Sequence, residues 1–229
     1  MPKDSKPNPL IEIGVTIALP ALILTKLSSA DRLGTVNALL LALAFPLVWG
    51  VWDGLKRRKI NWLATLGVVS TLLTGAIGLL SLDAKWLAVK EAAVPGLIGL
   101  VILGSTWTRT PLIRLMVFNA ALFNVDRVHQ TLDERGSTAA FESRLRTGTV
   151  MLALTFFFSA VGNYLLARHV VTSAAGTAAF NEELGKLTAL SYPIIAVPSM
   201  LMMMGLMWWL VRGAKQLTGL DLGEMLAGE

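Results

Sequence analysis

The chain contains no cysteine among its 229 residues, so it can form no disulfide, thiolate metal site or thiol nucleophile. Charged residues are also scarce. They make up 15% of the chain, whereas soluble domains usually carry about 25%. Hydrophobic residues make up 54%. A soluble domain of this length could not bury so many long apolar runs, so the composition predicts an integral membrane protein.

The positive charge of the chain is spread over its loops. The formal net charge is +5. Nucleic-acid-binding proteins usually gather Lys and Arg into a patch with interleaved aromatic residues, and no such patch or motif is present. Lys and Arg in short loops instead hold those loops on the cytoplasmic side of a membrane. We therefore expect no nucleic-acid partner.

A central hairpin fixes the expected orientation. A basic cluster at 56–59 precedes an apolar run at 60–82, which is long enough to cross a bilayer as a helix. The mixed-charge turn 83–86 follows, and a second apolar run at 92–107 leads back to Arg109. Because positive charge flanks the two outer ends of this hairpin, we predict that both ends lie in the cytoplasm.

The same reasoning predicts six transmembrane helices, with both termini inside. The expected spans are 10–24, 36–52, 60–82, 92–107, 147–167 and 187–211. The loops with a basic excess are 53–59, 109–146 and 212–215, and they face the cytoplasm; the loops 26–35, 83–91 and 168–186 face out. The fold class is therefore an all-α, polytopic membrane helical bundle of the cytoplasmic membrane.

One segment is too polar to span. Apolar residues recur at helical spacing over 111–132 among charged and amide side chains, which predicts an amphipathic helix on the cytoplasmic surface. We expect one integral membrane domain over 1–229. Its predicted parts are a tail (1–9), four spans (10–108), the cytoplasmic helix and loop (109–146), two spans (147–215) and a tail (216–229).

Glycines recur on the central spans. Gly75 and Gly78 lie one helical turn apart. The next span also carries three glycines, Gly96, Gly99 and Gly104. Small residues let helix backbones approach closely in lipid, so we expect these glycines at helix contacts. The methionines at 200–207 are expected to pack adaptably rather than to bind a metal.

The central hairpin resembles the septation protein A family of bacterial inner-membrane proteins. The matching residues are Arg58-Lys59-Ile60, Gly75, Gly78, Asp83, Lys90 and Pro111-Leu112-Ile113. The chain departs from the family pattern at Glu91, where that family is expected to have proline. The resemblance implies a role in cell-envelope maintenance or septum formation, with envelope-synthesis or division proteins as partners.

Polar residues at the outer ends of the spans form the candidate binding cluster. They are Lys90, Glu91, Asn163, Tyr164, Asn181, Glu182 and Lys186. Ionisable groups inside a membrane are costly and usually functional. Each also has a structural interpretation: Glu91 suits a helix start, Asn163 suits a bond between helices, and Asn181 with the glutamates after it suits an N-cap and first turn.

Three classes of function remain open. A scaffold or interaction protein fits the resemblance, with membrane lipids, envelope proteins or a second copy of the chain as partners. A small transporter or channel-like protein for a lipid-like or small polar solute fits the outer polar residues and the prolines within spans. The hairpins 59–90 and 146–186 also show a weak internal sequence similarity, and two similar hairpins would suit a pseudo-symmetric transporter.

An intramembrane enzyme is the weakest of the three. The two histidines, His129 and His169, are predicted on opposite sides of the membrane, so they cannot share a metal ion. No HExxH motif, nucleophile elbow or phosphate loop is present. We therefore expect no catalytic residue, no metal site and no cofactor.

Overall fold

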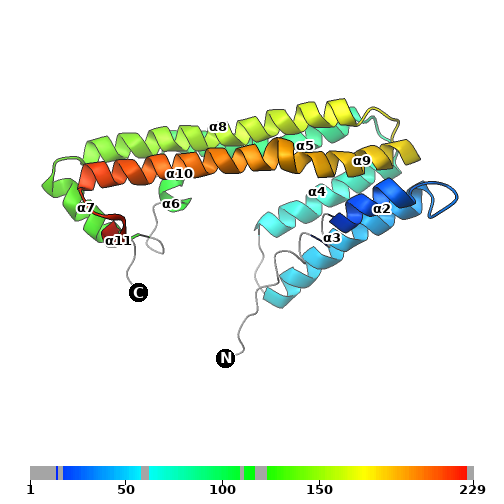
Figure 1. Ribbon diagram of the computed structural model, residues 1–229, viewed down its shortest axis with the longest axis horizontal. Helices are drawn as coiled ribbons and strands as arrows, with labels where there is room; N and C mark the ends of the chain where they lie inside the picture. Colours follow the sequence, from blue (N-terminus) through cyan, green and yellow to red (C-terminus); the bar gives the residue numbers. More distant parts are fainter. Residues whose placement is uncertain (1–13, 15–17, 58–61, 109–110, 117–122, 226–229) are drawn as a thin grey trace. The chain divides into compact units, whose positions relative to one another are not determined.

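The computed structural model describes residues 14, 18–57, 62–108, 111–116 and 123–225. All regular elements within these ranges are helices, which confirms the all-α fold class (Figure 1). They are α2 (Leu19–Leu27), α3 (Thr35–Arg57), α4 (Trp62–Leu79), α5 (Lys85–Gly104), the 3-10 helix η2 (Ser105–Trp107), α6 (Leu112–Met116), α7 (Val125–Glu134), α8 (Thr138–Val170), α9 (Ala178–Ser191), the π-helix η3 (Tyr192–Ala196), α10 (Val197–Thr218) and α11 (Leu222–Met225). The predicted tail 1–9, the start of the first span, the basic pair 58–59 and residues 117–122 lie outside the described residues.

Three of these helices are long and apolar enough to cross a membrane. They are Lys85–Trp107, Thr138–Val170 and the continuous helix Ala178–Thr218. Two shorter apolar stretches, Thr35–Gly50 and Val69–Leu79, overlap the second and third predicted spans. The chain thus has the long apolar helices of a membrane protein, while the count of six spans stays a prediction.

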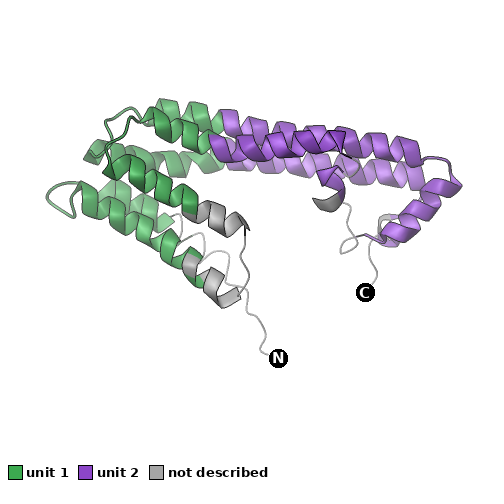
Figure 2. Ribbon diagram, turned by 180° about the vertical axis from the view of Figure 1, so that it is seen from behind, with its two compact units in different colours: residues 1–92, 162–194 green, residues 93–161, 195–229 purple. Residues whose placement is uncertain are grey.

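The contacts divide the chain into two compact units (Figure 2). Unit 1 comprises residues 1–92 and 162–194, and unit 2 comprises residues 93–161 and 195–229. The helices α5 and α8 each contribute residues to both units.

In unit 1, α2 packs against α3 and α9, and α3 packs against α4. The core contains Leu39, Leu87 and Phe180, which are almost completely buried. A Cβ added to Gly78 would lie 2.6 Å from Cδ2 of Leu39, and one added to Gly75 would lie 2.7 Å from the Leu43 side chain. The predicted role of these two glycines in close helix packing is therefore confirmed.

In unit 2, the core joins α5, α8 and α10. Ile102, Leu152 and Leu206 are buried there. A Cβ on Gly99 would lie 3.0 Å from the ring of Phe157, so this glycine also lies at a helix contact. Gly104 has no atom within 4 Å of such a Cβ, and the expectation of packing there was wrong.

The amphipathic segment 111–132 is not one helix. The structure has a short α6, then non-helical residues at Phe123 and Asn124, and then α7. Asn124 ends any continuous helix because its side chain accepts a hydrogen bond from the Arg127 amide as the N-cap of α7. Its own amide donates to the carbonyl of Met225 at 2.8 Å. Helical periodicity continued across this cap, which is why the sequence suggested a single helix.

The predicted tail 216–229 contains helical residues up to Met225. The helix α10 continues to Thr218 and ends at Gly219, whose φ of +70° is the left-handed conformation that glycine adopts readily. The short α11 follows, and Met225 is completely buried in the core of unit 2. The apolar Leu222 and Met225 are too few to signal a helix in the sequence.

Several helices begin earlier than the apolar runs that predicted them. The helix α5 begins at Lys85, so Glu91 lies in its second turn rather than at its start, and Pro95 lies inside the helix. The helix α8 has 33 residues and begins at Thr138, nine residues before the predicted span. Hydropathy locates the part of a helix that suits lipid, whereas polar residues extend the same helix beyond it.

The prolines lie at different kinds of position. Pro20 lies at the start of α2, where a missing amide hydrogen costs little, and Pro46 lies inside α3. Pro193 lies in η3, a π-helical turn that joins α9 to α10 without breaking the helix. Such turns relieve the loss of one backbone hydrogen bond and occur often at functional positions.

Candidate functional site

Lys90 and Glu91 form an ion pair on the α5 helix of unit 1. The Lys90 ammonium lies 2.7 Å from a Glu91 carboxylate oxygen and also donates to Thr74 Oγ1 of α4 at 2.7 Å. The Lys90 side chain is only 10% exposed, and that of Glu91 is 29% exposed. Thr74 in turn donates to the carbonyl of Ser70. A buried lysine in an apolar helix thus has its charge matched locally.

Asn181 lies in a different polar contact of unit 1. Its side chain is completely buried and donates to the Thr35 carbonyl at 2.8 Å and to Ser28 Oγ at 3.2 Å. Ser28 donates to the carbonyl of Leu24. The expected N-cap role of Asn181 was wrong because Thr177 caps α9, accepting from the Phe180 amide. Asn181 instead joins α9 to the turn between α2 and α3.

The remaining candidates of the sequence lie elsewhere in unit 1. Glu182 and Lys186 form an exposed pair one helical turn apart, in the second and third turns of α9 rather than at its start. Tyr164 is 40% exposed, and Asn163 is partly buried on α8. The pairings of the described residues thus place Lys90 with Glu91, Asn181 with the α2–α3 turn, and Glu182 with Lys186, in three separate groups.

Glu183 makes polar contacts, and it was not among the candidate residues predicted from the sequence. Its carboxylate accepts four hydrogen bonds, from the amides and the hydroxyls of Thr172 and Ser173. It therefore closes the connection between α8 and α9. Two consecutive hydroxyl residues ten residues upstream of a glutamate are a weak signal, which periodicity and hydropathy do not detect.

Arg144 is the second site that the sequence analysis missed, since it lies in the segment 109–146 that was predicted only as a cytoplasmic helix and loop. It lies in unit 2 on α8, and its guanidinium stacks on the Trp209 ring of α10, 3.9 Å from the ring centre. It also donates to the Trp209 carbonyl at 2.5 Å. Gly213 makes room for it, because a Cβ there would lie 1.6 Å from Arg144 Nε.

A small apolar cavity lies beside this arginine. Its volume is about 20 Å³, enough for about one water molecule. The lining residues are Phe123, Phe141, Arg144, Leu145, Leu210, Val211 and Ala214. Arg144 Nε is buried without a hydrogen-bond partner, and no carboxylate of the described residues pairs with this guanidinium.

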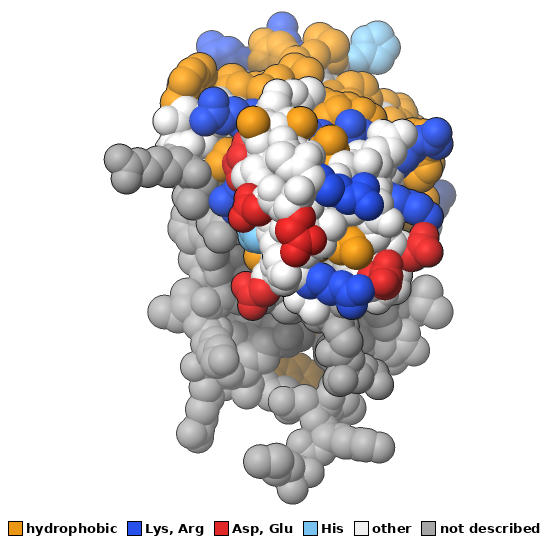
Figure 3. All heavy atoms as spheres, turned by 90° about the vertical axis from the view of Figure 1, so that its left-hand side faces the viewer, with side chains coloured by type: hydrophobic (Ala, Val, Ile, Leu, Met, Phe, Trp, Pro, Cys, Tyr) orange, Lys and Arg blue, Asp and Glu red, His pale blue; other side chains and the backbone are white. Residues whose placement is uncertain are grey.

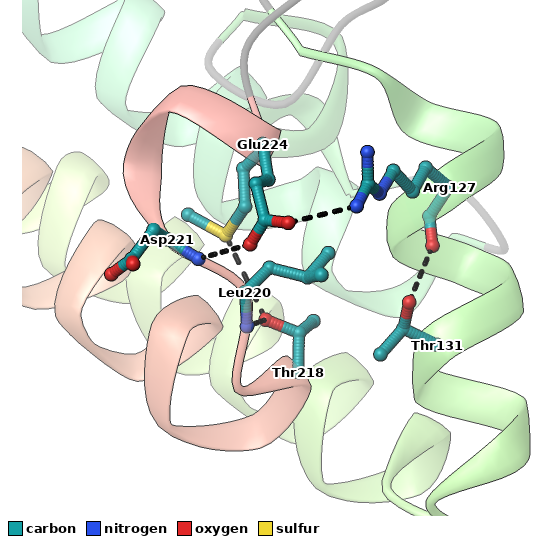
Figure 4. Close-up of polar contacts among 7 residues, drawn as sticks. Arg127, Thr131, Thr218, Leu220, Asp221 and Glu224 are labelled. Atoms are coloured by element: carbon teal, nitrogen blue, oxygen red, sulfur yellow. Dashed lines mark hydrogen bonds and ion pairs between the residues drawn. The ribbon is translucent and has the colours of Figure 1, made fainter.

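The end of unit 2 around α7 is charged. Figure 3 shows Lys and Arg side chains interspersed with Asp and Glu side chains over this end. Arg127 of α7 pairs with Glu224 of α11 at 2.9 Å, and Glu224 also accepts from the Asp221 amide at 2.9 Å (Figure 4). Lys215 lies 2.6 Å from the Asp221 carboxylate, and its hydrogen bond and charge lower the pKa of that carboxyl. We call α7, α11 and these paired residues the charged cap.

The chain matches no protein-family model, curated protein or solved structure. Within the described ranges, no group of three His, Asp or Glu residues is arranged to hold a metal ion.

Proposed function

We propose that this chain is a multi-pass protein of the bacterial cytoplasmic membrane that acts as a scaffold for cell-envelope maintenance or septation. The resemblance of the central hairpin to the septation protein A family suggests the process. The proposed role is to bind other membrane proteins, without a catalytic step. Lipids, envelope-synthesis or division proteins and a second copy of the chain are the proposed contacts.

The observation that carries the proposal is the apolar surface that the protein leaves uncovered. In the most apolar part of each long helix, only 17% to 28% of the residues are buried within the protein. On α10, Met200, Met204 and Trp208 are more than half exposed, and Gly205 between them has open space where a side chain would be. A face of this kind suits lipid or the close approach of another membrane helix.

The contacts between loops support six spans with both termini inside. Asn181 bonds to Ser28 and Thr35, so two segments predicted on the outer side touch within unit 1. Ser137 bonds to the carbonyl of Leu217, so two segments predicted on the cytoplasmic side touch within unit 2. A topology that separated these pairs across a bilayer would be incompatible with both contacts.

The absence of cysteine makes the topology directly testable. Single cysteines at the exposed positions Ala30 and Ala174 should react with a membrane-impermeant maleimide in intact spheroplasts. Cysteines at the exposed positions Ser143 and Gln216 should react only after permeabilisation. Labelling of all four positions from one side would contradict the proposed topology.

Site-specific photo-crosslinking tests the scaffold role. A photoreactive phenylalanine analogue at the exposed Met204 should give discrete adducts with an envelope-synthesis or division protein. The same analogue at Leu206, which is 2% exposed on the same helix, should give none and serves as the matched control. Mass spectrometry identifies the adducts. Adducts with lipid alone at Met204 would contradict the proposal.

A small transporter or channel-like protein is the second candidate. The buried Lys90 favours it, because a lysine that is only 10% exposed inside an apolar helix is expensive to retain without a role. The π-helical turn η3 with Pro193 adds an irregular segment to another long helix. The solute would be lipid-like or small and polar.

A further inference from the structure

We propose that Arg144 and the apolar cavity beside it bind the phosphate group of an anionic phospholipid from the cytoplasmic leaflet. The site belongs to unit 2, between α8 and α10. It rests on the membrane location in the proposed function but not on the scaffold role, because a transporter could hold the same lipid.

Within the described part of the chain, the positive charge of Arg144 is unmatched. The guanidinium carries five N–H donors, and the described residues provide it with one hydrogen bond, to the Trp209 carbonyl, and with the face of the Trp209 ring. Neither neutralises the cation. Its Nε–H is buried and lacks an acceptor. A water molecule in the cavity could accept that hydrogen bond, but only an anion would also balance the charge.

Arg144 lies at a depth that suits a lipid phosphate. Arg144 lies three residues before Thr147, where the apolar run of α8 begins, which corresponds to about 4.5 Å along a helix. The headgroup layer of a bilayer is about 5–8 Å thick on each side. On α10, Trp209 lies at the end of the apolar run, and Arg212 follows it. Both helices therefore place this cation at the level of lipid phosphates.

The walls of the cavity are apolar. Apart from Arg144, all its lining residues are apolar, including Phe141, Leu210 and Val211. A volume of about 20 Å³ admits one phosphate oxygen rather than a whole headgroup. The acyl chains would then lie along the exposed apolar surfaces of α8 and α10. A free phosphate ion would gain nothing from these walls, whereas a phospholipid would.

Native mass spectrometry of the full chain in detergent micelles tests the site. Dioleoyl phosphatidylglycerol is titrated against dioleoyl phosphatidylcholine, and inorganic phosphate is added as a competitor. We expect one phosphatidylglycerol to bind more tightly than phosphatidylcholine, and inorganic phosphate not to displace it. Arg144→Gln should weaken the binding of that lipid about tenfold, since it removes charge-assisted hydrogen bonds.

Two further variants separate this site from general surface charge and from misfolding. Arg146→Gln is the matched control, because Arg146 is exposed on the same helix, and it should change the affinity less than Arg144→Gln does. Val211→Phe fills the cavity while leaving the arginine in place, and it should also release the lipid.

Three results would overturn the proposal. The first is an equal effect of the two arginine variants, and the second is equal binding of the two lipids or displacement by inorganic phosphate. The third is unchanged lipid binding in Val211→Phe, which decides the matter even if Arg144→Gln fails to fold. Loss of the lipid with unchanged Met204 photo-adducts would separate this site from the scaffold role.

Discussion

Replacing Glu91 by Gln should destabilise the protein by about 3 kcal/mol or more, because it leaves the Lys90 ammonium buried without its counter-charge. Lys90 is only 10% exposed, and its other hydrogen-bond partner, Thr74, is neutral. Thermal unfolding in detergent micelles, followed by circular dichroism, measures the loss. The double variant Lys90→Met with Glu91→Gln should recover most of the stability, since it removes both charges together.

The pair Glu182 and Lys186 provides the matched control. Its two side chains are half exposed or more, so Glu182→Gln should leave the unfolding temperature almost unchanged. Equal effects of Glu91→Gln and Glu182→Gln would contradict the argument from burial. The double variant at Lys90 and Glu91 also bears on function. A stable but inactive protein in a solute-uptake assay would favour the transporter over the scaffold.

Replacing Asn181 by Asp should cost about 3 kcal/mol, because the new side chain cannot donate to the Thr35 carbonyl and Ser28. The site is completely buried, so an ionised carboxylate would also lose its hydration. We expect the turn between α2 and α3 to loosen first. Hydrogen exchange at residues 28–35 and the unfolding temperature together measure the effect.

Asn37 is a close control for this substitution. Its amide also donates to a backbone carbonyl, that of Leu33, but its side chain is exposed. Asn37→Asp should therefore change the stability by less than about 0.5 kcal/mol. If both aspartates were tolerated equally, Asn181 would not be the group that joins α9 to the α2–α3 turn.

The sequence predicted the fold class and some of the close helix contacts at glycines, because lipid-compatible length and small-residue spacing are local properties. Gly75 and Gly78 were recognised in this way, and their contacts with α3 are confirmed. The ends of α5, α8 and α9 were not recognised, since each helix continues through polar residues. The cap at Asn124 was missed because the apolar period continues across it.

The candidate cluster was predicted from residue types, and its members could not be paired from the sequence. The ion pair of Lys90 and Glu91 joins adjacent residues, yet the burial of Lys90 depends on where α4 lies. Asn181 and Ser28 are 153 residues apart, and no periodicity connects them. Arg144 was overlooked because its meaning depends on Trp209 and Gly213 of another helix.

The length of α8 determines how far the charged cap reaches from the membrane. The nine residues from Thr138 to Arg146 precede the apolar run and add about 14 Å of helix. This is more than the depth of one headgroup layer, which is about 5–8 Å. In the proposed orientation, the start of α8 and the turn 135–137 that joins it to α7 would therefore stand clear of the lipid in the cytosol. A water-soluble protein could dock on this end of unit 2 without entering the bilayer.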